Sequence, residues 1–461
     1  MYRSLEIEGF RGFGSHQRLD LAIANGTDPG SGLTIIVGEN NSGKSSIIEA
    51  LRSFTTVSPR FSEGQRNKSS EGRVRIVLRS DEAEIEIASN PRGGAIAKVT
   101  APPTVMRPLR ILALPSRRHF DTYFASGGGG QSRDGYERDL QQQYRRSGPM
   151  NVFLSRLVAA SDRRAEFDRV LGKLINPVPD WVIEQNDLGH GYIKVLCAHG
   201  THSTEGAGEG LLSLLSIADA LYDSSPGDVI AIDEPELSLH PAVLRRLSAT
   251  LGEYSKDRQI ILSTHSPYFP DPTFLFNGGE LCRLYLKERG SVICQVQRHT
   301  IERLKGLALN RNNPHVLGLD AREIFFQNDK IILVEGQDDV LFYPDVENEI
   351  GLKFEGSFFG WGVGGAENMP IFTSLLKDLD FSKVVGVLDS DKAAIARQLR
   401  GDFPQYLFVT MPAPDVRTKP ARRETPEKLG LLNGNTLRQE FRESVRELIT
   451  SVNEYLEREA A

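Results

Sequence analysis

The chain has 461 residues, of which 39% are hydrophobic and 25% charged, and its formal net charge is -6. This composition is typical of a globular protein of two or three domains, and the negative charge argues against a wholly basic nucleic-acid coat. Its three cysteines are too few and too irregularly spaced for a disulfide framework or a four-cysteine zinc site, so we expect a reducing cytoplasm. The charged N-terminus and the lack of a long apolar run favour neither a signal peptide nor a membrane span.

The first predicted element is a strand at residues 5–10, LEIEGF, whose alternating apolar and acidic side chains predict an edge or half-exposed position. The next is an apolar, β-branched run at residues 33–37, short enough for a buried parallel strand. Apolar side chains then recur at helical spacing as far as Phe54, so a helix follows this strand after a loop.

The loop between this strand and this helix, residues 38–45, matches G-x-x-x-x-G-K-[ST] at every fixed position. The backbone N–H groups of such a loop, together with the helix N-terminus, face an anion. We expect Lys44 to reach the β and γ phosphates of ATP and Ser45 to place its hydroxyl on Mg²⁺. The predicted nucleotide-binding residues here are Gly38, Asn40, Asn41, Ser42, Gly43, Lys44, Ser45 and Ser46.

An opening strand followed by this loop resembles the head domains of the SMC, RecF and Rad50 group of ABC-type ATPases. The resemblance implies an α/β head with a mixed sheet, in which Arg11 either approaches the nucleotide or stays in solvent. Residues 72–100 alternate at period two and predict antiparallel strands of a side sheet. Residues 151–175 predict a helical insert or dimer-facing arm around 140–180, and the glycines at 127–130 predict a surface connection.

A second nucleotide motif, VIAIDEPELSLHP, occupies residues 229–241. Its apolar run predicts a buried strand that ends in Asp233, expected to hold Mg²⁺, and Glu234, expected to act as general base. A further buried strand, QIILSTHS, ends in His265. The extended motif resembles the Walker B and D-loop segments of the overcoming-lysogenisation-defect (OLD) family, and this resemblance implies that His265 contacts the γ-phosphate.

The segment STEGAGEG, residues 203–210, stands where ABC-type heads have a signature loop that completes the nucleotide site of the opposite subunit. Ser203, Gly206 and Gly208 are the candidate donors, although the segment departs from the usual L-S-G-G-Q. If this loop acts in trans, hydrolysis requires two heads, so we expect a homodimer or a higher homo-oligomer.

The pattern of a buried strand followed by acids restarts at Lys330. KIILVEG and KVVGVLDSD predict two strands of one parallel sheet, whose carboxyl ends bring their acids together. Such a cluster suits one or two Mg²⁺ or Mn²⁺ ions, with Ca²⁺ as an alternative, for phosphodiester cleavage. The predicted ligands are Glu335, Asp339, Asp389 and Asp391.

A strand-end Glu-Gly with a downstream D-x-D resembles TOPRIM domains. An ATPase followed by TOPRIM resembles the OLD nucleases, including the A component of the Gabija antiphage system, over nearly the whole chain. We therefore predict an ABC-type head over residues 1–325 and a Rossmann-like TOPRIM nuclease domain over residues 326–461. The family usually has a catalytic lysine beyond the D-x-D, and Lys419 and Lys428 both lie in that region.

Other features of the second half are less specific. Glu367 and Glu427 are possible further ligands, although a surface role fits each better. Residues 415–428 form either a solvated loop or a strip that contacts DNA phosphates. Residues 436–459 predict an amphipathic helix that packs on its own domain or on a second chain. The cations of the strip are Arg417, Lys419, Arg422, Arg423 and Lys428.

The combined interpretation is a cytoplasmic, ATP-dependent DNA endonuclease in antiphage defence. Its expected partners are DNA and, as a further option, a helicase or another protein of the defence system. Two alternatives remain open from the sequence. One is a RecF-like DNA-binding or repair clamp with a silent TOPRIM domain, which the lack of a decisive lysine motif favours. The other is a regulatory subunit that senses nucleotide and controls a separate effector.

Overall fold

The computed structural model divides the chain into two compact units, Met1–Ile293 and Cys294–Ala461. The predicted boundary at residue 325 therefore shifts to an earlier position. The reason is that α8 (Arg298–Ala308) packs against α11 (Met369–Asp378), where Arg303 Nη1 donates to Ser374 Oγ at 3.2 Å. The structure describes residues 1–90, 95–105, 108–116, 124–125, 163–185, 187, 190–197, 200–203, 209–288, 290–308, 318–326, 330–421, 427–434 and 436–458.

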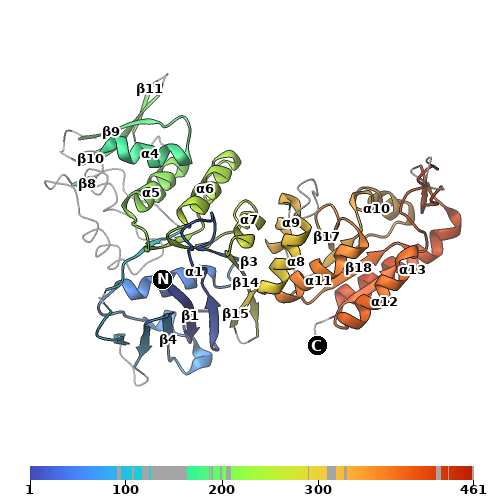
Figure 1. The fold of residues 1–461 in the computed structure, drawn as a ribbon, viewed down its shortest axis with the longest axis horizontal. Coiled ribbons are helices and arrows are strands. Elements are labelled where there is room, and N and C mark those ends of the chain that lie inside the picture. Colours follow the sequence, from blue (N-terminus) through green and yellow to red (C-terminus); the bar gives the residue numbers. More distant parts are fainter. Residues whose placement is uncertain are drawn as a thin grey trace. The chain divides into compact units, whose positions relative to one another are not determined.

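The first unit is built on a six-stranded sheet with the order β15-β14-β3-β13-β12-β7, of which β15, β14 and β3 are labelled in Figure 1. All pairs from β14 to β7 are parallel, so the carboxyl ends of these five strands lie at one edge. Every residue of β3, β12 and β13 is buried, as their continuous apolar runs predict. The strands are β3 (Leu33–Gly38), β7 (Ile111–Leu114), β12 (Val229–Asp233), β13 (Gln259–Ser263), β14 (Glu280–Lys287) and β15 (Gly290–Gln295).

The first unit also contains an antiparallel side sheet of five strands. This side sheet includes the two strands expected within residues 72–100. The expectation that the opening strand is an edge strand is wrong, because β1 lies between β2 and β4. Its Glu6 is buried and is compensated by Arg79, whose Nε donates to Oε1 at 2.8 Å. The order along the sheet is β2 (Gln17–Asp20), β1 (Tyr2–Glu8), β4 (Arg75–Ser80), β5 (Glu84–Ser89) and β6 (Ala97–Thr100).

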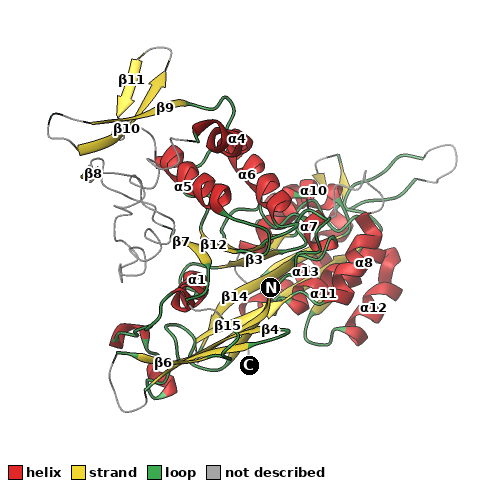
Figure 2. Ribbon diagram, turned by 60° about the vertical axis from the view of Figure 1, so that its left-hand side comes forward, coloured by secondary structure: helices red, strands yellow, loops and turns green. Residues whose placement is uncertain are grey.

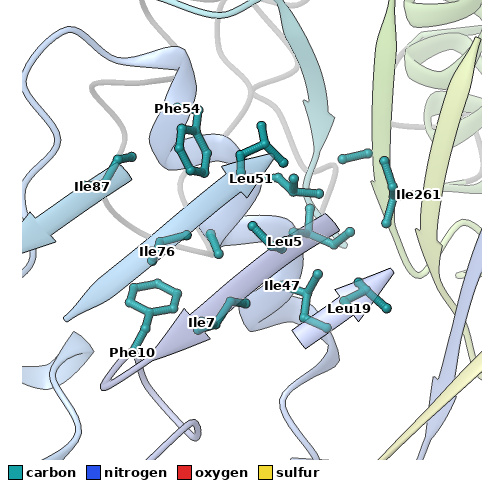
Figure 3. Packing of buried hydrophobic residues seen from close by; sticks show 14 of the residues in the cluster. Leu5, Ile7, Phe10, Leu19, Ile47, Leu51, Phe54, Ile76, Ile87 and Ile261 are labelled. Carbon is teal, nitrogen blue, oxygen red and sulfur yellow. The ribbon is translucent and has the colours of Figure 1, made fainter. Parts of the chain in front are cut away.

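The core of the first unit joins these two sheets through α1 (Lys44–Arg52), as Figure 3 shows. Ile47 and Leu51 of this helix lie in one cluster with Leu5 and Ile76 of the side sheet and Ile261 of β13. These side chains are at most 1% exposed. The helix that follows the glycine-rich loop is therefore fixed by the core on both sides.

In the first unit, α4 (Arg164–Leu174) packs against both α5 (Glu209–Asp223) and α6 (Pro241–Tyr254) (Figure 2). The predicted helical segment corresponds to α4. Residues 151–162 and the glycines at 127–130 lie outside the described residues. The first unit also has the short α7 (Pro272–Phe276) and 3-10 turns at Ser53–Thr55, Glu63–Gln65 and Lys68–Ser70. A separate antiparallel sheet contains β8 (Phe124–Ala125), β9 (Asp180–Gln185), β10 (His190–Cys197) and β11 (Gly200–Ser203).

The second unit is a four-stranded parallel sheet with the order β17-β16-β18-β19. The strands are β16 (Ile331–Val334), β17 (Ser357–Phe358), β18 (Val384–Leu388) and β19 (Leu407–Thr410), and a short hairpin joins β20 (Leu432–Asn433) and β21 (Thr436–Leu437). Its helices are α8, α9 (Leu319–Glu323), α10 (Gln337–Ile350), α11, α12 (Ala393–Asp402) and α13 (Arg442–Glu457), with 3-10 turns at Ile324–Phe326, Ala366–Asn368, Ser390–Lys392 and Gln439–Phe441.

The C-terminal amphipathic pattern forms α13, which is shorter than the predicted 436–459 because a strand and a 3-10 turn precede it. Its apolar stripe is buried in the core of the second unit, so this stripe serves its own domain. Within the described part of the chain, none of the helices combines the length and apolar character that spanning a bilayer demands. The buried stripe consists of Val445, Leu448, Ile449, Val452 and Leu456.

Candidate functional site

The loop between β3 and α1 folds round the ammonium group of Lys44. Lys44 Nζ donates to the carbonyl oxygens of Gly38 at 2.9 Å and Glu39 at 2.7 Å. Burial lowers the pKa of Lys44 to about 8, against the opposing effect of nearby carboxylates, of which Glu234 is the largest. Gly38 has φ 137, and a Cβ there would lie 2.0 Å from the Leu284 carbonyl oxygen, so the loop requires glycine.

The same loop fits a triphosphate. Lys44 is 5% exposed and offers a cation at the helix N-terminus, where backbone N–H groups also face an anion. Ser42 Oγ is buried, and within the described residues it has no hydrogen-bond partner, so a donor is left for a ligand oxygen. Asn40, Asn41, Gly43, Ser45 and Ser46 all lie on this loop or in the first turn of α1, as predicted.

The carboxyl ends of β12 and β13 bring the second nucleotide motif to this loop. Asp233, the last residue of β12, accepts a short hydrogen bond from Ser263 Oγ on the neighbouring strand. Glu234 follows with φ 47, a left-handed conformation that is strained for a residue with a Cβ, and its N–H donates to the Ser263 carbonyl oxygen at 2.9 Å. The backbone strain therefore falls on the expected general base.

His265 lies two residues beyond β13, with Nε2 3.8 Å from Glu234 Oε1. Burial and the Lys44 cation lower the pKa of His265, and the Asp233 carboxylate opposes them. The imidazole is therefore held in its neutral form near pH 7. Lys44, Asp233, Glu234 and His265, which are spread over more than 200 residues of sequence, are thus neighbours in space, as the motifs predict.

Glu236 is a residue to which the sequence analysis assigned no role. Its carboxylate accepts the backbone N–H of His265, and its Oε2 accepts the hydroxyl of Thr264 at 2.9 Å. Burial raises the pKa of Glu236, and these hydrogen bonds oppose the rise. The available signal was a second acid placed two residues after Glu234. Glu236 ties the segment after β12 to the residues after β13.

The candidate signature segment is described only at its ends. Ser203 is the last residue of β11, whereas Gly206 and Gly208 lie outside the described residues. Ser238 Oγ donates to Glu209 Oε2 at 3.0 Å, so the start of α5 contacts the segment that follows Glu234. Arg11 pairs with Glu49 of α1 at 2.6 Å.

In the second unit, the strand-end acids of β16 and β18 meet. The two strands are parallel neighbours with Val334 opposite Val387, and Asp389 N–H donates to Glu335 Oε1 at 2.8 Å. Burial raises the pKa of both carboxyls, to about 7 for Asp389. Lys428 Nζ lies 3.1 Å from Asp389 Oδ2 and 3.4 Å from Asp391 Oδ2.

The predicted cluster of four metal ligands needs correction. Among the described residues, no group of three or more His, Cys, Asp and Glu side chains is arranged to hold a metal ion. Asp339 instead folds back as the N-terminal cap of α10, where its Oδ2 accepts the Gly336 N–H at 2.9 Å. Glu335 and Asp389 are the two acids joined by a hydrogen bond, and Asp339 lies close enough to contribute to the raised pKa of Asp389.

This pair still fits one hard cation, because Mg²⁺ in proteins is commonly bound by one or two carboxylates with water and substrate phosphate completing its shell. Asp389 Oδ1 is buried and, within the described part of the chain, accepts no hydrogen bond. The Tyr343 hydroxyl is also buried and, among the described residues, has no hydrogen-bond partner. Burial raises its pKa well above the ordinary value, and the nearby acids Asp339, Asp389 and Glu335 add to the rise. Unpaired oxygens among buried acids mark a place that a cation stabilises.

The two candidate lysines, Lys419 and Lys428, face each other across a β-bridge. Each donates its backbone N–H to the carbonyl oxygen of the other at 2.9 Å. Lys428 contacts the strand-end acids, whereas Lys419 Nζ lies 3.2 Å from Asp338 Oδ2 and 2.6 Å from Asp415 Oδ2. Geometry therefore distinguishes Lys428 from Lys419. Asp415 is a buried acid that the sequence analysis passed over, although it stands four residues before Lys419.

The basic strip is partly neutralised by these acids. Arg417 Nε lies 3.0 Å from Asp338 Oδ2, and Arg422 and Arg423 lie outside the described residues. Glu367 has a side chain 72% exposed, and Glu427 is exposed too, which agrees with the surface role expected for both.

Two family models match the first unit. Residues 4–168 match a model described as "AAA domain", and residues 158–271 match one described as "AAA domain, putative AbiEii toxin, Type IV TA system". The curated protein "Endonuclease GajA" from Bacillus cereus (strain VD045) is 26% identical over 199 residues, which are 42% of this chain and 32% of GajA. The matched segment thus spans about a third of that relative.

Several solved structures are similar at low identity. They include an SMC head domain from Thermotoga maritima (18% identical, TM-score 0.37, 64% of this chain and 99% of that one), an SMC head bound to the C-terminal winged-helix domain of ScpA (14%, 0.43, 66% and 99%) and an SMC head with an extended coiled coil bound to the C-terminal domain of ScpA, derived from Pyrococcus furiosus (14%, 0.42, 68% and 100%).

Taken with the sheet order, these matches confirm the predicted α/β class. The two models, both described as AAA domains, cover residues 4–271, where the sequence predicts the ATPase head. The similarity to Endonuclease GajA agrees with the resemblance to OLD-type ATPase-nucleases that the motifs indicated. Neither family model reaches the second unit.

Proposed function

We propose that this chain is an OLD-type enzyme in which ATP binding and hydrolysis by the first unit control metal-dependent cleavage or nicking of DNA by a TOPRIM domain in the second unit. The observation that carries the nuclease half is the hydrogen bond from Asp389 N–H to Glu335, which pairs the acids of two adjacent strand ends. Lys428 lies beside this pair. The 26% identity to an endonuclease supports the same reading.

For ATP hydrolysis, the residues of the first unit have separate tasks. Lys44 binds the β and γ phosphates, and its lowered pKa reflects a buried cation that an anion would compensate. Glu234 accepts a proton from the attacking water, and neutral His265 holds the γ-phosphate side of the site. Ser45 and Asp233 would hold Mg²⁺, which supplies charge neutralisation at the phosphates when bound.

For DNA cleavage, Glu335 and Asp389 would hold Mg²⁺ or Mn²⁺, which supplies stabilisation of charge on the attacked phosphate when bound. Lys428 donates to Asp389 and would pair with a phosphate oxygen of the DNA. Lys419 and Arg417, which pair with Asp338, would contact the DNA backbone farther along.

The wider setting is proposed on the same basis. Two copies would form a homodimer or a larger homo-oligomer in which the 203–210 segment of one chain completes the nucleotide site of the other. Antiphage defence in the cytoplasm, alongside a helicase or another defence protein, would follow from the resemblance to the Gabija component.

The test is plasmid nicking by the full chain with Mg²⁺ or Mn²⁺, with and without ATP. Glu335→Ala and Asp389→Ala should each lower nicking at least roughly 100-fold while ATP hydrolysis stays within about twofold of wild type. Glu234→Gln should instead abolish ATP hydrolysis, because it removes the general base, while ATP still binds. Nicking that persists in both acid variants would place the metal site on the wrong residues.

A second candidate function is a RecF-like DNA-binding or repair protein, or a nucleotide-sensing regulatory subunit, with a silent TOPRIM domain. The observation that favours it is the ion pairing of Lys428 with Asp389 and Asp391, which neutralises the acids that a metal needs. If the wild type nicks DNA and this lysine serves cleavage, Lys428→Ala should lower nicking by roughly 100-fold. A wild type without nicking on any DNA form supports the silent domain.

A further inference from the structure

The loop at residues 359–365 runs along the carboxyl end of β16 and ends beside Glu335. Three backbone hydrogen bonds hold it there, and the last of them reaches the residue proposed as a metal ligand. They join Phe359 N to Ile332 O at 2.9 Å, Val363 N to Val334 O at 2.9 Å and Gly365 N to Glu335 O at 2.8 Å. The loop therefore follows β16 and stays hydrogen-bonded to it as far as Glu335.

The backbone of this loop is packed directly against the residue after Glu335. Gly362 has φ 83, and a Cβ there would lie 2.7 Å from Gly336 Cα, so only glycine allows the approach. Asn368 Nδ2 donates to the carbonyl oxygens of Val363 at 3.1 Å and Gly364 at 2.9 Å. These contacts fix the backbone conformation of the loop.

The side chain at the tip of this loop is Trp361, which is 39% exposed. The chain has two tryptophans, and the other, Trp181, is 1% exposed with its Nε1 donating to Asp168. An indole that keeps 39% of its surface exposed on a fixed loop offers a flat apolar surface to a ligand.

Sheet order places the segment that carries Trp361 next to the segment that carries Glu335. The segments that follow β17, β16, β18 and β19 lie in that order along the carboxyl edge, because neighbouring strands are parallel. They carry Trp361, Glu335, Asp389 and Asp415 in turn, and Asp415 is paired with Lys419. The edge thus runs from an aromatic group, through the acids, to cations.

We propose that Trp361 stacks on an unpaired base of the DNA strand whose phosphate lies at Glu335 and Asp389. A nucleic-acid strand matches this order, since it carries phosphates for the acid and cation end and a flat base one nucleotide away for the indole. The inference rests on the proposed nuclease function and extends it. It assigns the second unit a preference for single-stranded or locally opened DNA.

The test measures binding of a fluorescein-labelled 20-nucleotide single strand of mixed sequence to the full chain, in EDTA and again with Ca²⁺. Trp361→Ala should weaken binding roughly 5- to 150-fold, the factor measured for one stacked base. Trp361→Phe should recover most of it. Leu341→Ala, which removes another exposed apolar side chain of the second unit, should leave affinity unchanged. Thermal unfolding of each variant checks that the domain is folded.

A strand of equal length without bases provides the sharper comparison. Wild type and Trp361→Ala should bind this abasic strand equally, because it offers phosphates but nothing to stack on. In Trp181→Phe protein the remaining tryptophan emission should be quenched by the normal strand and not by the abasic one. Equal affinities of wild type and Trp361→Ala for the normal strand overturn the stacking role.

The outcomes also separate this inference from the nuclease proposal. Nicking that depends on Glu335, with normal-strand binding unaffected by Trp361→Ala, rejects stacking and keeps the nuclease. Base-dependent binding through Trp361 in a protein that never nicks DNA keeps stacking and favours the silent domain. A wild type that binds neither strand in either buffer rejects both.

Discussion

At the scale of single residues, burial shifts the charged groups of the two sites in opposite directions. In the first unit burial lowers the pKa of Lys44, so an anion would stabilise the site. In the second unit burial raises the pKa of Glu335 and Asp389, so a cation would stabilise it. The nucleotide triphosphate and the divalent metal of the proposed function carry the charges that these two environments require.

Glu236 is expected to position His265 for ATP hydrolysis. Glu236→Gln keeps one acceptor oxygen for the His265 N–H and loses the other, so kcat should fall roughly tenfold while ATP affinity stays near wild type. Glu236→Ala leaves buried donors unpaired and should also cost about 1–3 kcal/mol of stability. Steady-state ATPase kinetics and thermal unfolding measure these effects.

Glu253→Gln is the matched control, since Glu253 is an exposed acid on α6. Wild-type kcat in Glu236→Gln, with His265→Ala inactive, would show that the carboxylate does not position the histidine.

At the scale of elements, both sites are built from segments that follow adjacent parallel strands. Asp233 and Ser263 meet because β12 and β13 are neighbours, and Glu335 and Asp389 meet because β16 and β18 are neighbours. The helix after the first strand differs between the sites. The start of α1 carries Lys44, whereas the start of α10 carries the cap Asp339.

The cap of α10 should make stability depend on pH. Burial raises the pKa of Asp339 from 3.8 to about 7, so between these values the native state binds more protons than the unfolded state. Stability should therefore fall as pH rises through this window. Asp339→Asn keeps an oxygen for the Gly336 N–H and removes this titration, so it should reduce the slope to the part that Glu335 and Asp389 contribute. It should also raise Tm at pH 7 by roughly 2–4 °C per kcal/mol recovered.

Thermal unfolding in EDTA between pH 4 and pH 7.5 checks this expectation. Asp345→Asn, a change of the same chemistry farther along α10, should keep the wild-type slope. Parallel slopes for wild type and Asp339→Asn would remove Asp339 as the source.

At the scale of the whole molecule, each unit has a hydrophobic cluster made of its own residues. The cluster of the first unit runs in sequence from Leu5 to Leu284, and that of the second unit from Ile332 to Leu456. Each unit also contains one tryptophan, Trp181 in the first and Trp361 in the second. Separate cores predict separate unfolding.

Single-tryptophan variants should therefore report two urea transitions in the full chain. Trp361→Phe follows the first unit and Trp181→Phe follows the second. ATP with Mg²⁺ at about 100 times its Kd should stabilise the first transition by about 2.7 kcal/mol and leave the second unchanged. Superimposable transitions that ATP shifts together would instead show that the two units unfold as one.

The sequence by itself determined the glycine-rich loop at residues 38–45, the strands that end in the candidate catalytic acids and the class of the fold. These follow from local chemistry: glycines that allow the loop at 38–45, apolar runs that must be buried, and acids placed at the ends of such runs. The same local patterns misjudged β1, because whether a strand lies at an edge depends on what pairs with it.

Only the tertiary structure decided which acids meet and which cations neutralise them. Asp339 caps its own helix although its spacing from Glu335 fits a shared site, and Lys428 rather than Lys419 contacts Asp389. Glu236 and Trp361 gain significance only from what the fold places beside them. The physical reason is that charge pairing and burial depend on distances of a few ångströms between segments far apart in the chain, which strand order fixes and local sequence does not.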